Sequence, residues 1–154
     1  MNPFMKEAIR LALENVESGS GGPFGAVIVK NEKIIATGVN QVTSNNDPTA
    51  HAEIVAIRKA CEALNSFQLT GCEIYSSCEP CPMCLGAIYW ARPDKLYFAC
   101  TRVDAAQHGF DDEFIYKELN IAIELRSIPT HQLMRDEALA VFKKWDASDK
   151  KVAY

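Results

Sequence analysis

The sequence predicts an α/β fold, a three-layer α/β/α sandwich built on a mixed sheet. Residues 24–30 and 33–39 are short runs rich in β-branched residues, and the polar pair Asn31-Glu32 between them is typical of an antiparallel hairpin. Further along the chain, two βα units follow one another, which predicts neighbouring parallel strands with crossover helices. A hairpin on one side and parallel strands on the other make the sheet mixed.

The individual elements follow from periodicity and from residues that begin or end helices. Asn2-Pro3 begins an amphipathic helix that ends near Gly19. Residues 49–64 have a helical repeat of apolar side chains without internal Gly or Pro, so a helix is expected there, beginning at His51 or just before. The remaining expected elements are strands at residues 73–77 and 95–100, helices at 82–91, 111–119 and 137–145, and an extended piece at 123–129.

Composition and charge narrow the classes of function. The 154 residues are 48% hydrophobic and 23% charged, as in soluble globular proteins, and their number predicts one domain over residues 1–154. A net charge of −4 disfavours a dedicated nucleic-acid binder. No apolar run has the length of a membrane span, and the first twenty residues are too charged for a signal peptide. We therefore expect a cytoplasmic protein that binds neither nucleic acid nor membrane.

The strongest chemical signal is an H-A-E sequence that starts at His51, followed by C-E-P-C-P-M-C at residues 78–84. Cys81 and Cys84 are three residues apart at a helix start, so they share one face and their sulfurs can converge on one metal ion. Two prolines force the helix to begin there, and a helix N-terminus favours thiolates. Together with His51 they form three ligands with an open fourth position, which is typical of catalytic zinc.

A carboxylate beside that open position indicates hydrolysis. Zinc lowers the pKa of a bound water to roughly 7, and Glu53 is placed to take a proton from this water and pass it on. The sequence thus predicts one zinc ion per chain, although iron or cobalt could occupy the same ligands. A zinc-stabilised binding module without catalysis is the alternative class, but such a module has no use for Glu53.

Other interpretations of the six cysteines are weaker. Three disulfides would be typical of a secreted protein, whereas the charged first twenty residues do not predict an export signal. A C-x2-C-x2-C sequence resembles part of an iron-sulfur ligand run, but the expected fourth cysteine is missing. A CxxC pair alone also occurs in redox motifs and structural zinc knuckles. Cys61, Cys72 and Cys100 are expected to be small core residues.

These motifs resemble the zinc-dependent cytidine deaminase superfamily, whose signature is H-x-E with P-C-x-x-C. Within it, G-G-P-F-G-A-V-I-V, N-D-P-T-A-H-A-E, S-S-C-E-P-C-P-M-C-L-G-A-I-Y-W-A and G-F-D-D-E-F-I-Y-K-E look very like bacterial guanine deaminases. The resemblance is close over residues 21–119, loose over 121–149, and returns at the C-terminal tyrosine. It implies a mixed five-stranded sheet between helices and a hydrolase of purine catabolism or salvage that converts guanine to xanthine and ammonia.

The resemblance also assigns roles to single residues. It implies that His51, Cys81 and Cys84 hold zinc and that Glu53 carries a proton from the zinc-bound water to the ring. The residues that it implies in substrate binding are Phe24, Asn40, Ala52, Trp90, Asp112 and Tyr154. By their types alone, an asparagine at a strand end is equally typical of a turn, and an aromatic residue in a strand or helix is more typical of a core.

Asp112 would distinguish guanine from other bases. Guanine carries a ring N–H beside its exocyclic NH2, and one carboxylate accepts hydrogen bonds from both. Adenine and cytosine offer an acceptor beside the amino group, which a carboxylate repels. The resemblance implies that Asp112 also protonates the departing ammonia. A helix N-cap is the alternative role, which Asp111 would serve as well.

The C-terminal tail and the nature of the substrate leave further alternatives. The related guanine deaminases are dimers whose C-terminal segments exchange. This resemblance implies a homodimer in which residues 146–154 reach the partner subunit and Tyr154 closes its pocket; a frayed terminus is the alternative.

A tRNA adenosine deaminase shares H-A-E and P-C-x-M-C. The acidic charge, the lack of a basic C-terminal helix and the G-F-D-D segment disfavour it. Guanosine as the substrate stays open.

Overall fold

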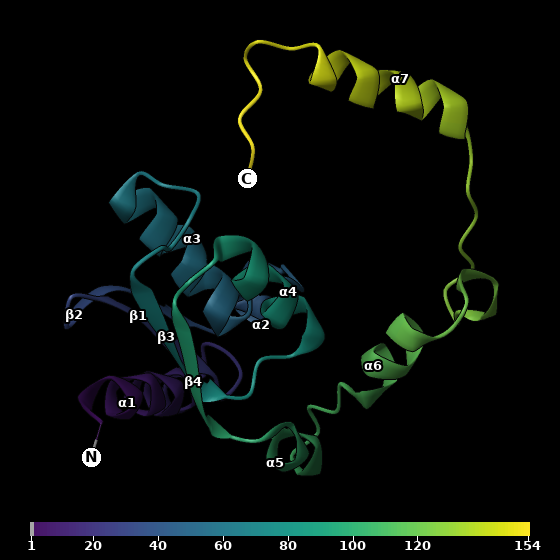
Figure 1. Ribbon diagram of the computed structural model, residues 1–154. Helices are drawn as coiled ribbons and strands as arrows, with labels where there is room; N and C mark the ends of the chain where they lie inside the picture. Colours follow the sequence, from purple (N-terminus) through teal and green to yellow (C-terminus); the bar gives the residue numbers. More distant parts are fainter. Residues whose placement is uncertain (1) are drawn as a thin grey trace. The chain divides into compact units, whose positions relative to one another are not determined.

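The computed structural model describes residues 2–154, in two units (Figure 1). The first unit ends at Asp112 and the second is Glu113–Tyr154. The second unit contains α6 (Glu113–Asn120), the 3-10 helix η1 (Ile123–Leu125) and α7 (Arg135–Asp146). All strands of the described residues lie in the first unit, together with the residues of the H-A-E and C-E-P-C-P-M-C motifs.

The first unit is organised around a mixed sheet with strand order β2-β1-β3-β4. Strand β1 (Gly25–Lys30) pairs antiparallel with both β2 (Lys33–Val39) and β3 (Cys72–Cys78). Strand β3 pairs parallel with β4 (Lys95–Cys100), which makes β4 an edge strand. The predicted hairpin, the predicted parallel pair and the mixed character of the sheet are confirmed.

The sheet of the described residues has four strands, so the expectation of five strands is wrong. The chain leaves β4 and forms the short helix α5 (Arg102–Gln107). A capping box starts this helix, because Thr101 Oγ1 accepts from the Asp104 N–H at 3.3 Å while the Asp104 carboxylate accepts from the Thr101 N–H at 2.7 Å. Residues 123–129, expected to be extended, contain η1 instead of a strand.

Helices cover both faces of this sheet, as the predicted three-layer sandwich requires. On one face, α1 (Pro3–Glu17) packs against side chains of β1 and β3. On the other face, α3 (Ala52–Leu64) and α4 (Pro82–Ala91) pack against alternate side chains of the same strands. Because side chains alternate along a strand, Tyr75 of β3 contacts the α1 layer while Ile74 lies in the α3 and α4 layer.

Helix boundaries agree with the sequence to within about two or three residues, except for two short helices that no pattern predicted. The side chain of Asn2 caps α1, accepting from the backbone N–H groups of Phe4 and Met5 at 3.0 Å each. The two helices without a sequence prediction are α2 (Val42–Asn45) and α5, each six residues or shorter. In the described part of the chain, no helix is long and apolar enough to cross a membrane.

Candidate metal centre and its surroundings

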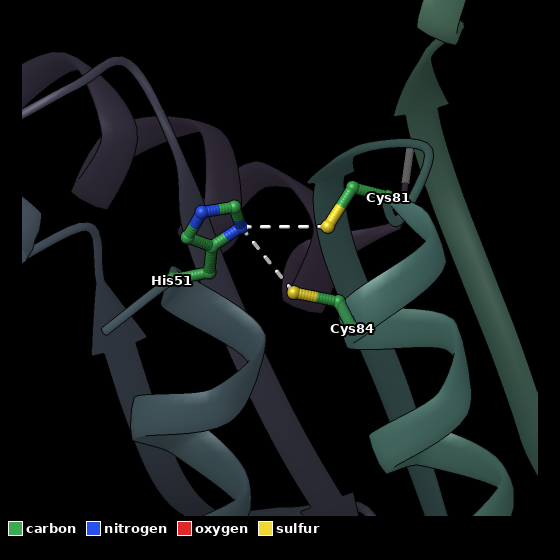
Figure 2. Close-up of side chains that lie close together, drawn as sticks. All are labelled: His51, Cys81 and Cys84. Carbon is green, nitrogen blue, oxygen red and sulfur yellow. Dashed lines mark hydrogen bonds between the residues drawn. The ribbon is translucent and has the colours of Figure 1, made fainter. Parts of the chain in front are cut away.

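Three metal-ligating side chains from two helix starts converge in the first unit, as Figure 2 shows. His51 is the N-cap of α3, Cys81 is the N-cap of α4, and Cys84 lies in the first turn of α4. The His51 Nδ1 atom lies 3.5 Å from Cys81 Sγ and 3.5 Å from Cys84 Sγ. One ligand atom from each residue lies within 4.8 Å of the other two. The predicted ligands are therefore brought together.

The spacing of these atoms fits zinc. Typical Zn–S and Zn–N bonds of about 2.3 Å and 2.0–2.1 Å, at a tetrahedral angle, separate nitrogen from sulfur by about 3.5 Å. Both nitrogen to sulfur distances in the cluster have this value. Two thiolates and one imidazole are a donor set that zinc prefers, and three ligands leave a fourth position open. The cluster is suited to one zinc ion per chain.

Burial and mutual contacts shift the pKa values of the three ligands. Hydrogen bonding from Cys84, together with the neighbouring His51, lowers the pKa of the Cys81 thiol to about 4 despite partial burial. The hydrogen bond between the two cysteines is the main cause that raises the pKa of the Cys84 thiol, and burial raises it further. The contact with Cys81 also raises the pKa of His51. Cys81 is therefore the thiolate of the pair before any metal ion binds, which favours metal capture.

Close packing of α3 against the hairpin brings His51 to this position. Gly38 of β2 makes the approach possible: a Cβ atom there would lie 2.1 Å from the Ala52 carbonyl oxygen, in the first turn of α3. On the other side, Pro82 at the first position of α4 has a φ already suited to a helix start. The two helix starts thus face each other above the sheet.

Glu53 lies beside the cluster and is almost fully buried, with 6% of its surface exposed. Its Oε1 accepts a hydrogen bond of 3.3 Å from the hydroxyl of Ser76 on β3. Burial raises the pKa of the Glu53 carboxyl, and the nearby Cys81 thiolate raises it further. A carboxyl with a raised pKa beside a metal cluster is the type of group that takes up and releases protons during a reaction.

Comparison with known proteins identifies the family. Residues 1–100 match the model of the cytidine and deoxycytidylate deaminase zinc-binding region. The chain belongs to this deaminase family. As a member of a zinc-dependent deaminase family it is a hydrolase, and the cluster of His51, Cys81 and Cys84 is suited to hold its zinc ion.

Similar proteins include deaminases of two kinds. Guanine deaminase of Bacillus subtilis (strain 168) is 58% identical over 142 residues, 92% of this chain and 91% of that protein. An X-ray structure of guanine deaminase from Bacillus subtilis has a TM-score of 0.97 at 56% identity, covering 100% of this chain and 99% of the other. A tRNA-specific adenosine deaminase of Aquifex aeolicus (strain VF5) is 46% identical over 96 residues, 62% of this chain and 63% of that protein.

Two of the predicted substrate residues lie together in the deaminase. Asn40 is buried at the end of β2; its Oδ1 accepts from the Val42 N–H at 3.2 Å, and its own N–H donates to the Phe24 carbonyl at 3.1 Å. The ring of Phe24 meets Phe110 edge to face, with the centroids 4.9 Å apart. Ala52, between two site residues, is fully buried in the core cluster.

Asp112 is the last residue of the first unit of the deaminase and is partly buried. Burial raises the pKa of its carboxyl, the negative Cys81 raises it further, and the guanidinium of Arg102 acts in the opposite direction. The influence of Cys81 places Asp112 within electrostatic range of the metal cluster.

The two remaining candidates are exposed. Trp90 has 63% of its surface exposed and follows Cys84 by six residues, about 9 Å along the axis of α4. Tyr154 is exposed in the second unit. Cys72 is buried as predicted and Cys61 is half-buried, but the core position predicted for Cys100 is wrong. Cys100 is exposed because it ends the edge strand β4.

Three residues near the site escaped the sequence analysis: Asn15, Ser76 and Phe110. A signal exists for Asn15, because Ala8, Ala12 and Asn15 form the buried helical stripe of α1 and an amide interrupts it. For Ser76 the signal is a pair of adjacent serines, Ser76 and Ser77, in a strand that is otherwise mostly apolar. Polar residues at such positions require partners, and a sequence does not say which.

Proposed function

We propose that this deaminase hydrolyses guanine to xanthine and ammonia. The observation that carries the proposal is the 58% identity with Bacillus subtilis guanine deaminase over 92% of the chain. A zinc cluster with a buried carboxylate beside it supports the hydrolytic part of the proposal. Residues 1–154 then work as a single deaminase domain, which we expect in the cytoplasm.

The proton chemistry falls to Glu53. Zinc held by His51, Cys81 and Cys84 would supply Lewis acidity and would lower the pKa of a bound water to about 7. Glu53 takes up one proton of the attacking water and delivers it to a ring nitrogen of the base. Its burial and raised pKa suit both steps, because a carboxyl that is too acidic would keep the negative charge and release the proton prematurely.

Selectivity for guanine is assigned to Asp112. Its carboxylate accepts hydrogen bonds from the ring N–H and the exocyclic NH2, a pair of adjacent donors that adenine and cytosine lack. The Asp112 carboxylate also takes up the second proton of the attacking water, which its raised pKa favours, and gives this proton to the departing ammonia. The charge of Cys81 acts on the Asp112 carboxyl, which supports a place for this carboxyl near the metal cluster.

The remaining pocket residues bind the base. Asn40 offers an amide at the end of β2, and Phe24, supported edge to face by Phe110, offers an aromatic face for stacking. Ala52 and Trp90 complete the proposed pocket, because both lie in the sequence motifs that resemble those of bacterial guanine deaminases. The exposed indole of Trp90 has the surface needed to meet a ligand or a partner chain.

We further propose a homodimer in which the C-terminal segment of each chain reaches the active site of the other. No residue of the second unit is buried, and its exposed side chains include Phe114, Phe142 and Trp145. Exposed apolar surface on this scale marks an interaction site. Residues 146–154 form the tail, and Tyr154 closes the pocket of the partner.

A tRNA adenosine deaminase is the second candidate, favoured by the 46% identity with the Aquifex aeolicus protein. That match spans 62% of this chain, against 92% for guanine deaminase. The net charge of −4 also disfavours a polyanionic substrate. Guanosine is a closer alternative, because it presents the same pair of donors to Asp112.

Ammonia release tests the proposal. Purified protein with measured zinc content is offered guanine, guanosine, adenine, cytosine, cytidine and an adenosine-containing tRNA anticodon stem-loop in parallel. We expect turnover of guanine, and loss of this turnover in Glu53→Gln with zinc retained. Turnover of guanosine or of the stem-loop, without turnover of guanine, would transfer the assignment to that substrate.

A further inference from the structure

Asn15 lies at the centre of a buried hydrogen-bond network that ends at the proposed base-binding residues. It sits near the end of α1 with 4% of its surface exposed. Its Nδ2 donates two hydrogen bonds, to the carbonyl of Gly22 at 2.9 Å and to the carbonyl of Asn40 at 3.0 Å. One side chain thereby joins the helix, the loop that follows it and the end of β2.

The same network continues to Phe24. The Asn40 N–H donates to the Phe24 carbonyl at 3.1 Å, and the Phe24 N–H donates to the Gly22 carbonyl at 2.8 Å. A Cβ atom on Gly22 would lie 3.4 Å from the Phe24 ring and 3.5 Å from Asn40 Cγ. The two side chains proposed to bind the base therefore share backbone partners that Asn15 holds.

The chain approaches Asn15 closely enough to require a glycine. A Cβ atom on residue 21 would lie 2.1 Å from the Asn40 carbonyl oxygen and 2.9 Å from Asn15 Nδ2. Such contacts are far below van der Waals distance, so Gly21 permits the close approach. Two independent features, a buried amide and a glycine without space for a side chain, fix the same junction.

From this junction we infer that Asn15 is a positioning residue for substrate binding: its amide fixes the loop at residues 20–24 against the end of β2 and thereby sets the positions of Asn40 and Phe24. The expected effect of Asn15 on guanine binding rests on the proposed function. It concerns binding rather than chemistry, because no contact links Asn15 to the zinc ligands or to Glu53 in the hydrogen bonds of the described residues. When Asn40 and Phe24 are held less firmly, the base binds more weakly. Once the base is bound, the reaction proceeds at a similar rate.

The test uses Asn15→Ala, Asn15→Asp and a matched control, Asn2→Ala. Asn2 also makes two hydrogen bonds of 3.0 Å with its side chain, at the opposite end of the same helix and away from the junction. Asn15→Asp keeps the shape of the side chain but replaces the donor with an oxygen that faces two carbonyls. We expect both Asn15 variants to raise KM for guanine about tenfold with kcat within about threefold and zinc content unchanged. Asn2→Ala leaves both kinetic constants near the parent values.

Binding is measured directly in a Glu53→Gln background, where guanine is not consumed. Adding Asn15→Ala there raises the Kd for guanine about tenfold, and adding Asn2→Ala does not. Gly21→Ala, which drives a methyl group into the Asn40 carbonyl, weakens binding in the same direction as Asn15→Ala. An unchanged Kd and KM in the Asn15 variants overturns the inference, as does an equal effect of Asn2→Ala.

Hydrogen exchange separates this inference from the proposed function. In Asn15→Ala, backbone amides of residues 20–24 and 40–42 exchange faster than in the parent, whereas Asn2→Ala accelerates only the first turn of α1. Unchanged exchange at the junction overturns the positioning role whatever the substrate is. A parent protein that neither binds nor converts guanine refutes the proposed function instead, and the exchange result then still decides whether Asn15 holds the junction.

Discussion

Ser76 and Glu53 are joined by a hydrogen bond inside the protein, from the hydroxyl on β3 to the carboxyl in the first turn of α3, over 3.3 Å. Both residues are buried. Because side chains alternate along a strand, the next residue, Ser77, has a different partner: its Oγ accepts from the Gly25 N–H at 3.0 Å. Two neighbouring serines thus serve different purposes.

Replacing Ser76 should slow the reaction. Ser76→Ala removes the donor that orients the Glu53 carboxylate, and a hydrogen bond to a charged group contributes about 1.5–3 kcal/mol, so we expect kcat to fall about tenfold or more. Zinc content should not change. Ser77→Ala is the matched control, expected to lower the melting temperature while kcat stays within about twofold. Equal losses of kcat in the two variants would contradict a specific role for Ser76.

Removing the carboxylate of Asp112 should abolish most of the turnover of guanine. Asp112→Ala loses two charge-assisted hydrogen bonds to the base, so we expect kcat/KM for guanine to fall about 100-fold or more. Metal analysis should still find one zinc ion per chain. The exposed neighbour provides the comparison, and Asp111→Ala is expected to keep nearly full activity. Wild-type kinetics in Asp112→Ala would refute the role.

After metal removal, one thiol of the cluster should react with an alkylating reagent before the others. With zinc bound, Cys81 and Cys84 resist alkylation; after chelation, Cys81 should react first, since hydrogen bonding from Cys84 and the neighbouring His51 lower its pKa to about 4. Burial raises the pKa of Cys78 to about 11, so its thiol stays protonated and unreactive at neutral pH and gains reactivity as the pH rises towards that value. Peptide mass spectrometry at pH 7 and pH 10 measures both, and modification of Cys78 ahead of Cys81 at pH 7 would contradict this order.

Shortening the tail should impair turnover without dissociating the subunits. Deleting residues 151–154 removes Tyr154, which we propose closes the pocket of the partner, while α7 remains intact. We therefore expect a higher KM for guanine, measured by steady-state kinetics, and an unchanged mass by light scattering. Val152→Ala, which alters another exposed tail residue, is the control. Normal kinetics of the deletion would mean that the tail is a frayed terminus.

The hairpin turn offers a gain in stability. Both turn residues have left-handed backbones, with φ of 49° at Asn31 and 59° at Glu32, as in a type I′ turn. A residue other than glycine or asparagine is strained there, so Glu32→Gly should raise the free energy of unfolding by about 0.5–1 kcal/mol. Glu32→Ala controls for loss of the charge. Denaturant titration measures the effect, and an equal gain from both variants would assign it to the charge.

Local sequence patterns predicted the longer helices, the four strands and the residues of the metal cluster. Asn2-Pro3, the apolar repeat of residues 49–64 and the prolines around Cys81 predicted three helix starts within about three residues, because capping and proline geometry act over one helical turn. The cysteine pair could also be predicted from local sequence, because residues three apart on a helix lie on the same face and can bind one metal ion. The expectation of a fifth strand failed because it came from the resemblance and not from a pattern in this sequence, and the piece expected to be extended at residues 123–129 contains η1 instead.

What the sequence by itself determined is the chemistry available: a histidine, two cysteines and a carboxylate with the spacing of a zinc hydrolase. Only the tertiary structure decided which distant groups complete it. Ser76 meets Glu53 across 23 positions of the sequence, and Asn15 meets Asn40 across 25. No periodicity encodes such pairs, because they depend on which strand lies beneath which helix and on how closely the backbones approach. Burial then gives these contacts their strength, since a polar group without access to water must find its partner within the fold.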